Sequence, residues 1–294
     1  MVARRRVSIV LITHNRRDDV LRTLPRLLTL PDAAETIVVD NGSDDGTVEA
    51  VVSAHPAARV IALPENRGAA GRNVGVALAS SPYVAFADDD SWWEPGALTV
   101  AADLFDAHPR LGALAGRVVV GAERVTDSTC EAMRASPLPP ADDLPGPPVL
   151  GFISCGTIVR ASAFVSVGGF DPMFGVGGEE RLLATDLVMA GWGVCYSPDV
   201  VAVHMPSPAR DREQRRRRLV RNDLWHVWLR RRPASAMATT VRVMLSARDA
   251  TVRAGLVDAL GALPTVLRRR RPVSLEIERQ FRLIDPPVAA LTRG

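Results

Sequence analysis

A chain of 294 residues with 47% hydrophobic and 23% charged residues can bury a sizeable core, which excludes extensive disorder. That length allows one large domain or one domain with a smaller appendage. All 36 basic residues are arginine, and with 33 acidic residues they give a net charge of +3. Runs such as Arg215–Arg218 and Arg268–Arg271 suit an anionic partner, either a membrane surface or a nucleic acid, or they cover solvated helix faces.

The cysteines and the lengths of the apolar runs indicate in which cellular compartment the protein is expected. The cysteines, Cys130, Cys155 and Cys195, are far apart and predict neither a disulfide framework nor a metal site. No run reaches the roughly 20 apolar residues of a membrane-spanning helix. The apolar run Val7–Ile12 follows a basic start but is too short for a signal peptide, and it predicts a buried first strand. We expect a cytoplasmic protein.

Short β-branched runs alternate with amphipathic stretches over the first 120 residues, which predicts a mostly parallel, Rossmann-like sheet flanked by helices. The expected strands are Val7–Ile12, Thr36–Asp40, Arg59–Leu63, Tyr83–Ala87 and Ala113–Val120. The expected helices are Asp18–Leu30, Thr47–Ala54, Ala69–Ala79 and Pro95–Ala107.

The rest of the chain predicts a loop, a strand, and then helices. Proline-rich residues 121–148 predict a mobile loop, Gly151–Val159 a strand and Glu179–Ala190 a helix. From about Pro206 the sequence turns to Arg-rich helices, expected at Arg212–Leu229 and Ala234–Leu267. We therefore expect an α/β domain over residues 1–206 and a C-terminal helical region over residues 207–294.

Polar residues follow each of the first four predicted strands, where ligands of such sheets bind. Asp88, Asp89 and Asp90 come directly after an apolar strand. Adjacent carboxylates repel one another unless a cation shares them, so this motif predicts a Mg²⁺ or Mn²⁺ site that holds a diphosphate, with Asp88 and Asp90 on one side. The alternative is a solvated acidic turn that caps the next helix.

Two more motifs follow strand ends. Asp40, before the turn Asn41–Gly46, is placed to accept the imide N–H of a uracil or thymine ring, or it only begins a turn. In the segment Glu65–Gly75, glycines allow close backbone approach and Arg72 is suited to meet a phosphate. The glycine spacing is not that of a dinucleotide fingerprint, which disfavours a nicotinamide enzyme.

This ordered set of motifs resembles inverting family-two glycosyltransferases with the GT-A fold. The resemblance spans about Val7 to His204, and the matching segments are Ile12–Arg16, Val39–Thr47, Asn66–Gly68 with Arg72–Gly75, Asp88–Asp90, Gly169–Phe174, Gly178–Glu180, Ala190–Trp192 and Pro198–His204. It implies a nucleoside-diphosphate sugar donor of the UDP or dTDP type and a divalent cation, Mg²⁺ or Mn²⁺.

The resemblance also implies roles for single residues. The donor would be held by Thr13, Arg16, Asp40, Arg72 and Asp89, with Asp40 on the pyrimidine. The metal ligands would be Asp88, Asp90 and His204. The alternative for His204 is a strand-end histidine with a backbone partner.

The catalytic base departs from the family pattern. Members carry Glu-Asp and then, two residues on, a second Asp; this chain has Glu179-Glu180 and then Leu182. Glu180 takes the position of the base, and its carboxylate suits general-base work. The alternative is that the two glutamates only favour a helix start.

The sequence leaves the acceptor undecided: a glycan, a lipid-linked molecule or a natural product, which attacks the sugar through a hydroxyl or an amine. Trp92, Trp93, Phe174 and Trp192 are candidates for stacking on sugars, although for Trp192 a place in the core is favoured. The C-terminal helices suit peripheral contact with the inner face of a membrane, a homodimer surface or a lid on the core. Nucleic acid is not expected as a partner.

Two other readings stay open. A sugar nucleotidyltransferase shares the α/β layout, but Thr13–Arg16 lacks the glycines of its phosphate loop. A non-catalytic binding or scaffold protein would explain the altered segment at Glu180–Leu182, but it has no need of the acidic motif.

Overall fold

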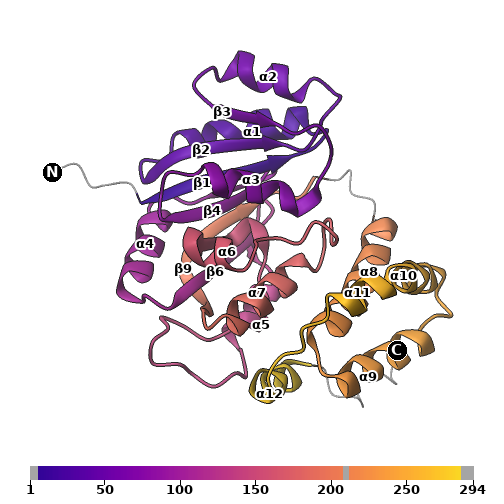
Figure 1. Cartoon of the computed structure of the whole chain (residues 1–294). Coiled ribbons are helices and arrows are strands. Elements are labelled where there is room, and N and C mark those ends of the chain that lie inside the picture. Colours follow the sequence, from indigo (N-terminus) through magenta and orange to yellow (C-terminus); the bar gives the residue numbers. More distant parts are fainter. Residues whose placement is uncertain (1–5, 208–211, 286–294) are drawn as a thin grey trace. The chain divides into compact units, whose positions relative to one another are not determined.

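The computed structural model describes residues 6–207 and 212–285, which form two compact units (Figure 1). The first unit comprises residues 6–134 and 141–207, and the second comprises residues 135–140 and 212–285. The predicted regions 1–206 and 207–294 include residues 1–5, 208–211 and 286–294, which lie outside the described part of the chain.

The first unit is an α/β layer structure built on a sheet that has nine strands among the described residues. Its strands are β1 (Val7–Thr13), β2 (Ala33–Asp40), β3 (Arg59–Ala62), β4 (Tyr83–Asp88), β5 (Ser91–Trp93), β6 (Leu111–Val120), β7 (Val125–Thr126), β8 (Thr157–Arg160) and β9 (Gly193–His204). Its α-helices are α1 (Arg17–Leu28), α2 (Thr47–Ala54), α3 (Gly71–Leu78), α4 (Ala97–Ala107), α5 (Ser128–Arg134), α6 (Ala161–Ser166) and α7 (Glu179–Met189).

The strand order is β3-β2-β1-β4-β8-β6-β9-β5, and β7 pairs with β6. The run β3-β2-β1-β4 is parallel, whereas β8 is antiparallel to both of its neighbours. Because the parallel strands share one direction, their carboxyl ends meet at one edge of the sheet, where such folds bind ligands.

Each face of the sheet is covered by helices because successive residues of a strand point to opposite faces. Ile9 and Leu11 of β1 pack in one core cluster with residues of α1 and α4, such as Leu24 and Phe105. Val10, between them, faces a second cluster that includes residues of α3, α6 and α7. The sheet is therefore buried on both sides, which explains its near-continuous apolar strands.

The second unit is helical over its described residues, with α8 (Arg212–Arg230), α9 (Pro233–Leu245), α10 (Ala250–Gly261), α11 (Leu263–Arg268) and α12 (Leu275–Ile284). None of the described helices combines the length and apolarity needed to cross a membrane.

The predicted fold class is confirmed, and so are all of the strands and helices expected in the first 120 residues, with shifts at their ends. The strand predicted at Gly151–Val159 is wrong in its first half. The carbonyl of Ile153 accepts hydrogen bonds from the Gly156 N–H at 3.0 Å and the Thr157 hydroxyl at 2.8 Å. These bonds close a 3₁₀ turn over Ser154–Gly156, so the strand begins only at Thr157.

Two other sequence predictions need correction. Residues 121–148 do not form one continuous loop, because they contain β7 and α5. Cys130 and Met133 of α5 are buried in the core. The single helix predicted at Ala234–Leu267 is three helices, α9, α10 and α11. The first break occurs because the Asp249 side chain accepts the N–H groups of Thr251 and Val252 and so caps α10.

Candidate functional site

The carboxyl ends of β1, β2 and β4 bring three predicted site residues to one edge of the sheet. Thr13 of β1 lies opposite Asp40 of β2 in the strand register. Ile12, one residue earlier, lies opposite Asp88 of β4. The parallel pairing alone therefore places Thr13, Asp40 and Asp88 side by side.

The acidic turn Asp88–Asp90 is held to this edge by β1. The Thr13 hydroxyl donates a hydrogen bond of 3.0 Å to Asp89 Oδ2. Desolvation, followed by the neighbouring charges of Asp88 and Asp90, raises the pKa of Asp89 to about 8. Without a cation, the crowding of these carboxyl groups therefore favours the protonated form of Asp89.

Asp90 is brought against the end of β9. Ser91 of β5 pairs with His204, the last residue of β9, and the Met205 N–H donates to the Asp90 carbonyl at 2.8 Å. His204 Nε2 then lies 3.3 Å from Asp90 Oδ1. The backbone N–H of Ser207 donates to Asp90 Oδ2 at 3.3 Å. The predicted metal ligands Asp90 and His204 are therefore together.

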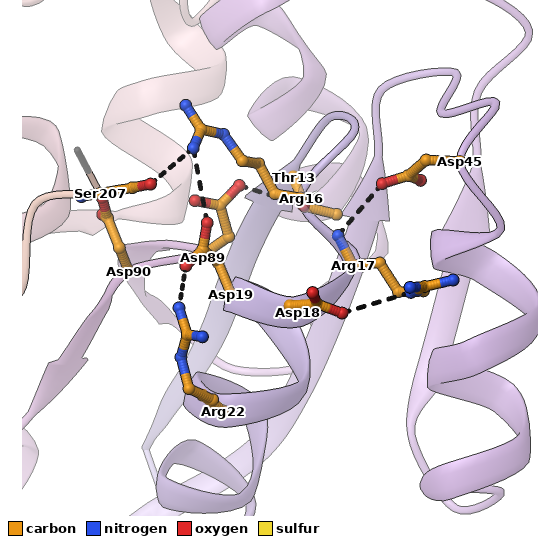
Figure 2. A network of polar contacts seen from close by, with 10 residues as sticks. All are labelled: Thr13, Arg16, Arg17, Asp18, Asp19, Arg22, Asp45, Asp89, Asp90 and Ser207. Carbon is orange, nitrogen blue, oxygen red and sulfur yellow. Dashed lines mark hydrogen bonds and ion pairs between the residues drawn. The ribbon is translucent and has the colours of Figure 1, made fainter. Parts of the chain in front are cut away.

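Arg16 reaches the same turn through the segment after β9 (Figure 2). Its guanidinium Nη1 donates to the Ser207 hydroxyl at 2.7 Å and forms an ion pair with Asp19 at 3.5 Å. Asp19, on α1, also pairs with Arg22. Arg16 is thus oriented from two sides, and its positive charge opposes the rise in the pKa of Asp89.

Arg72, in the first turns of α3, forms an ion pair with Asp88. Its side chain is only 3% exposed, and its guanidinium carbon lies 5.6 Å from the ring centroids of both Phe86 and Phe170. Its Nε has no hydrogen-bond partner among the described residues. Arg72 therefore offers buried positive charge at Asp88 rather than an exposed guanidinium.

Asp40 is buried at the end of β2 and organises the turn that follows it. Its two oxygens accept the Ser43 N–H at 2.8 Å and the Ser43 hydroxyl at 2.5 Å. The Ser43 hydroxyl in turn accepts the N–H of Asn15, a non-glycine residue with positive φ. A carboxylate has about four lone-pair sites, so two accepted bonds leave room for a ligand N–H.

Glu179 and Glu180 open α7 after Gly178, whose φ of 86° is suited to glycine. Glu180 accepts a hydrogen bond of 3.1 Å from the Ser154 hydroxyl. Glu179 is buried, and desolvation, followed by the charge of Glu180, raises its pKa well above the ordinary value, against the opposing charge of Arg72. Leu182, at the place of the family's second Asp, is buried.

The side chains around the acidic turn are of the kinds that bind a divalent cation. Among the described residues, no group of three or more His, Cys, Asp or Glu side chains is placed to hold one. Asp90 and His204 face each other, but Asp88 is engaged by Arg72. Two carboxylates and an imidazole suit Mg²⁺ or Mn²⁺ in kind. The residues fit such an ion provided that Asp88 exchanges Arg72 for it.

Several contacts at the site could not be read from the sequence. Ser207 links Arg16 to Asp90, and Ser154 holds Glu180. Neither serine stands in a recognisable motif. Asn73 could have been noticed within the Arg72–Gly75 segment: its amide exchanges two hydrogen bonds with the Phe170 backbone, at 2.8 and 2.9 Å, and ties α3 to the segment before α7.

Two of the four suggested sugar-stacking aromatics, Trp93 and Phe174, are wrong. Trp93 and Phe174 are fully buried, and the Trp93 indole N–H donates to the Phe86 carbonyl at 3.0 Å. The guanidinium carbon of Arg26 lies over the Trp92 ring, 4.0 Å from the ring centroid. Trp192 donates to the Ser166 hydroxyl at 3.2 Å. These contacts are those of packing side chains.

Comparison with known families identifies the chain. The family described as "Glycosyl transferase family 2" matches residues 8–168, more than half of the chain. The chain therefore belongs to glycosyltransferase family 2, as its motifs predicted, and its activity is that of a glycosyltransferase.

Individual relatives support this membership. An N-acetylglucosaminyl-diphospho-decaprenol L-rhamnosyltransferase of Mycobacterium tuberculosis is 27% identical over 240 residues, which cover 70% of this chain and 78% of that one. Among solved structures, a mannosyltransferase of Pyrobaculum calidifontis in complex with GDP-Man and Mn²⁺ has a TM-score of 0.59 at 21% identity, covering 98% of this chain and 78% of that one. S. aureus TarS 1-349 in complex with UDP-GlcNAc has a TM-score of 0.57 at 18% identity, covering 76% and 66%. The two structures establish the GT-A fold.

Proposed function

We propose that this glycosyltransferase takes a sugar from a UDP- or dTDP-sugar and transfers it, with inversion and with the help of a divalent cation, to a lipid-linked acceptor. The observation that carries the proposal is the meeting of Thr13, Asp40 and the acidic turn at one sheet edge, where Asp90 faces His204 at 3.3 Å. Ligands of open α/β sheets bind at this edge.

The donor would lie along the ends of β1 and β2. Asp40, with spare acceptor capacity, would receive the imide N–H of a uracil or thymine ring. Thr13, Arg16 and Asp89 would lie between the nucleoside and the diphosphate. Arg72, buried against Asp88, would contribute its charge to the diphosphate end of the site.

Asp88, Asp90 and His204 would hold the cation. A bound Mg²⁺ or Mn²⁺ supplies positive charge against the leaving diphosphate. The cation would also reduce the mutual repulsion of the carboxylates in the acidic turn. Arg72 would be released from Asp88 in the process and would stay close enough to add its own charge.

Glu180 would act as the general base. Its carboxylate would take the proton of the acceptor hydroxyl while that oxygen forms a bond to the anomeric carbon. The anomeric carbon–oxygen bond to the diphosphate breaks at the same time, and its electron pair leaves with the diphosphate. A single displacement of this kind inverts the anomeric carbon. Ser154, which donates to Glu180, would fix the carboxylate's direction.

A lipid-linked acceptor is supported by the name of one relative that aligns over most of the chain. The Mycobacterium tuberculosis relative, by its name, adds L-rhamnose to an N-acetylglucosaminyl-diphospho-decaprenol, and its alignment covers most of both chains. An acceptor of that type carries its own diphosphate, so the site would have to tolerate anionic groups on both substrates.

Calorimetric titration of the full chain with UDP, dTDP and GDP, each with and without Mn²⁺, tests the donor site. We expect Mn²⁺-dependent binding of a pyrimidine diphosphate, and loss of that binding in Asp90→Ala. Asp142→Ala, an exposed acidic residue of the same unit, is the matched control. If none of the three nucleotides bound, the donor site proposed here would be refuted and a binding or scaffold role would replace it.

A further inference from the structure

Helix α9 of the helical unit carries four of its five large apolar residues on the outside, and the fifth, Val243, is half-buried. Met237 is 54% exposed, Val241 47%, Met244 58% and Leu245 78%. These positions follow the spacing i, i+4, i+7 and i+8, so they form one stripe along the helix. We call these four residues the α9 stripe.

The helix is fixed in this orientation by its other side. Ala236 is completely buried, and the Trp228 indole N–H of α8 donates to the Thr240 hydroxyl at 3.0 Å. Neither residue belongs to the stripe. An amphipathic surface helix ordinarily turns its apolar side to the core, so α9 packs with its apolar stripe reversed, toward the solvent.

The unit that presents the stripe is strongly basic. Residues 212–285 contain 18 arginines against seven acidic residues, a net charge of +11. By contrast, residues 6–207 contain 14 arginines against 25 acidic residues, a net charge of −11. Arg242 is half-buried in the last turn of α9. Arg248, just beyond that helix, and Arg253, in the first turn of α10, are exposed. Apolar side chains and positive charge therefore lie next to each other.

We propose that the α9 stripe docks the enzyme on an anionic lipid bilayer, with Met237, Val241, Met244 and Leu245 in the interface and the nearby arginines on the head groups. A helix with apolar residues on one side and arginine beside them binds such surfaces, and its affinity depends on both contributions. The charge decides the occupant. A second copy docking through the same stripe would bring two units of +11 together, whereas anionic lipid is complementary to both features. A nucleic acid would leave the apolar residues exposed.

The inference does not require the proposed donor, acceptor or base. It concerns a surface in the helical unit, and vesicle binding is measured without substrates. A failure here would leave the proposed transferase chemistry untouched, and the reverse also holds.

The test is sedimentation of the full chain with vesicles of phosphatidylcholine that contain about one-third phosphatidylglycerol, compared with phosphatidylcholine alone. We expect binding to the anionic vesicles, loss of that binding at high salt, and no binding to the neutral ones. Met244→Glu/Leu245→Glu should weaken the partition by about tenfold or more. These side chains are exposed, so the variant should keep its melting temperature.

The matched control is Val52→Glu/Val165→Glu, which adds the same charge at exposed valines of α2 and α6 in the other unit. It should bind anionic vesicles like the unaltered chain. The proposal is overturned if the unaltered chain does not bind, or if the α9 variant binds equally well. It is also overturned if light scattering shows a dimer that only the α9 variant disrupts, because the stripe would then join two copies.

Discussion

Arg231 of the helical unit and Arg72 of the α/β unit are both almost completely buried, but their surroundings differ. Arg231 donates to Glu278 at 2.9 and 3.0 Å and pairs with Asp285 at 2.8 Å, while Ser235 donates to Glu278 at 2.5 Å. Arg72 pairs with Asp88, and its Nε is without a partner among the described residues.

A buried glutamate lies near each arginine, and the pKa values of the two glutamates are shifted in opposite directions. Burial disfavours the charge of Glu278, but hydrogen bonds from Arg231 and Ser235 outweigh it and lower the pKa of Glu278. Burial and the adjacent Glu180 raise the pKa of Glu179. Buried charge that is balanced by its partners holds a fold together, whereas buried charge in excess marks a site that awaits a ligand. Substitutions in the two clusters should therefore have different consequences.

The largest effect is expected at the site, from Glu180→Gln. If Glu180 is the general base, kcat should fall by about 10³-fold because the acceptor proton has no place to go. Stability should change little, since Glu180 is only partly buried. Steady-state transfer assays and thermal melting give both quantities.

The graded control for this prediction is Ser154→Ala, which removes only the hydrogen bond to Glu180. Its kcat should fall by no more than about tenfold. Nucleotide binding should be unchanged in both variants. A Glu180→Gln enzyme with a normal kcat would exclude the base assignment.

The next largest effect is expected from Glu278→Gln, in the buried cluster of Arg231, Glu278 and Asp285. This change removes the buried negative charge of Glu278 and leaves Arg231 paired with Asp285. The free energy of unfolding should therefore fall by about 3 kcal/mol. Nucleotide binding at low temperature should be retained. Urea titration followed by circular dichroism measures the loss, and Glu276→Gln, an exposed glutamate of the same helix α12, is the control. Equal stabilities of the two variants would contradict a structural role for the cluster.

The two units also differ in how far their sequences could be interpreted. In the α/β unit, functional residues follow buried strands, so Thr13, Asp40 and Asp88 could be placed at one edge from the strand pattern alone. Their partners could not: Ser207 lies 191 residues from Arg16, and no local pattern links them. The role of Arg72 toward Asp88 was missed because its burial depends on Phe170, which is distant in the sequence.

In the helical unit, periodicity predicted helices but not their ends. The break before α10 depends on one capping residue, Asp249, which is not conspicuous among the arginines around it. Helix α12, which was not predicted, begins at Ser274, whose hydroxyl accepts the Ile277 N–H at 3.2 Å. Its burial comes from Phe281 and Glu278, and the partner of Glu278 lies 47 residues away. Tertiary contacts, and not local propensity, decide these elements.

The smallest effect, and the one that separates the two clusters most directly, is that of Glu179→Gln on the pH dependence of stability. The pKa of Glu179 is raised above its ordinary value of 4.5 in the folded chain, so the folded state binds this proton more tightly than the unfolded state does. Its contribution to stability is complete below 4.5 and is lost as the pH rises through the folded pKa.

The unaltered chain should therefore lose stability as the pH rises above the ordinary pKa of 4.5 and through the raised pKa of the folded state, and Glu179→Gln, which cannot ionise, should flatten that slope. At the upper end the variant should be more stable by about 1 kcal/mol, measured by urea titration without divalent cations. Glu278→Gln should shift the curve in the opposite sense, because the pKa of Glu278 is lowered and its contribution is present above its ordinary pKa. If Glu179→Gln instead destabilised the chain at the upper end, the charged carboxylate would have to be the favoured form, and Arg72 would then balance Glu179 as Arg231 balances Glu278.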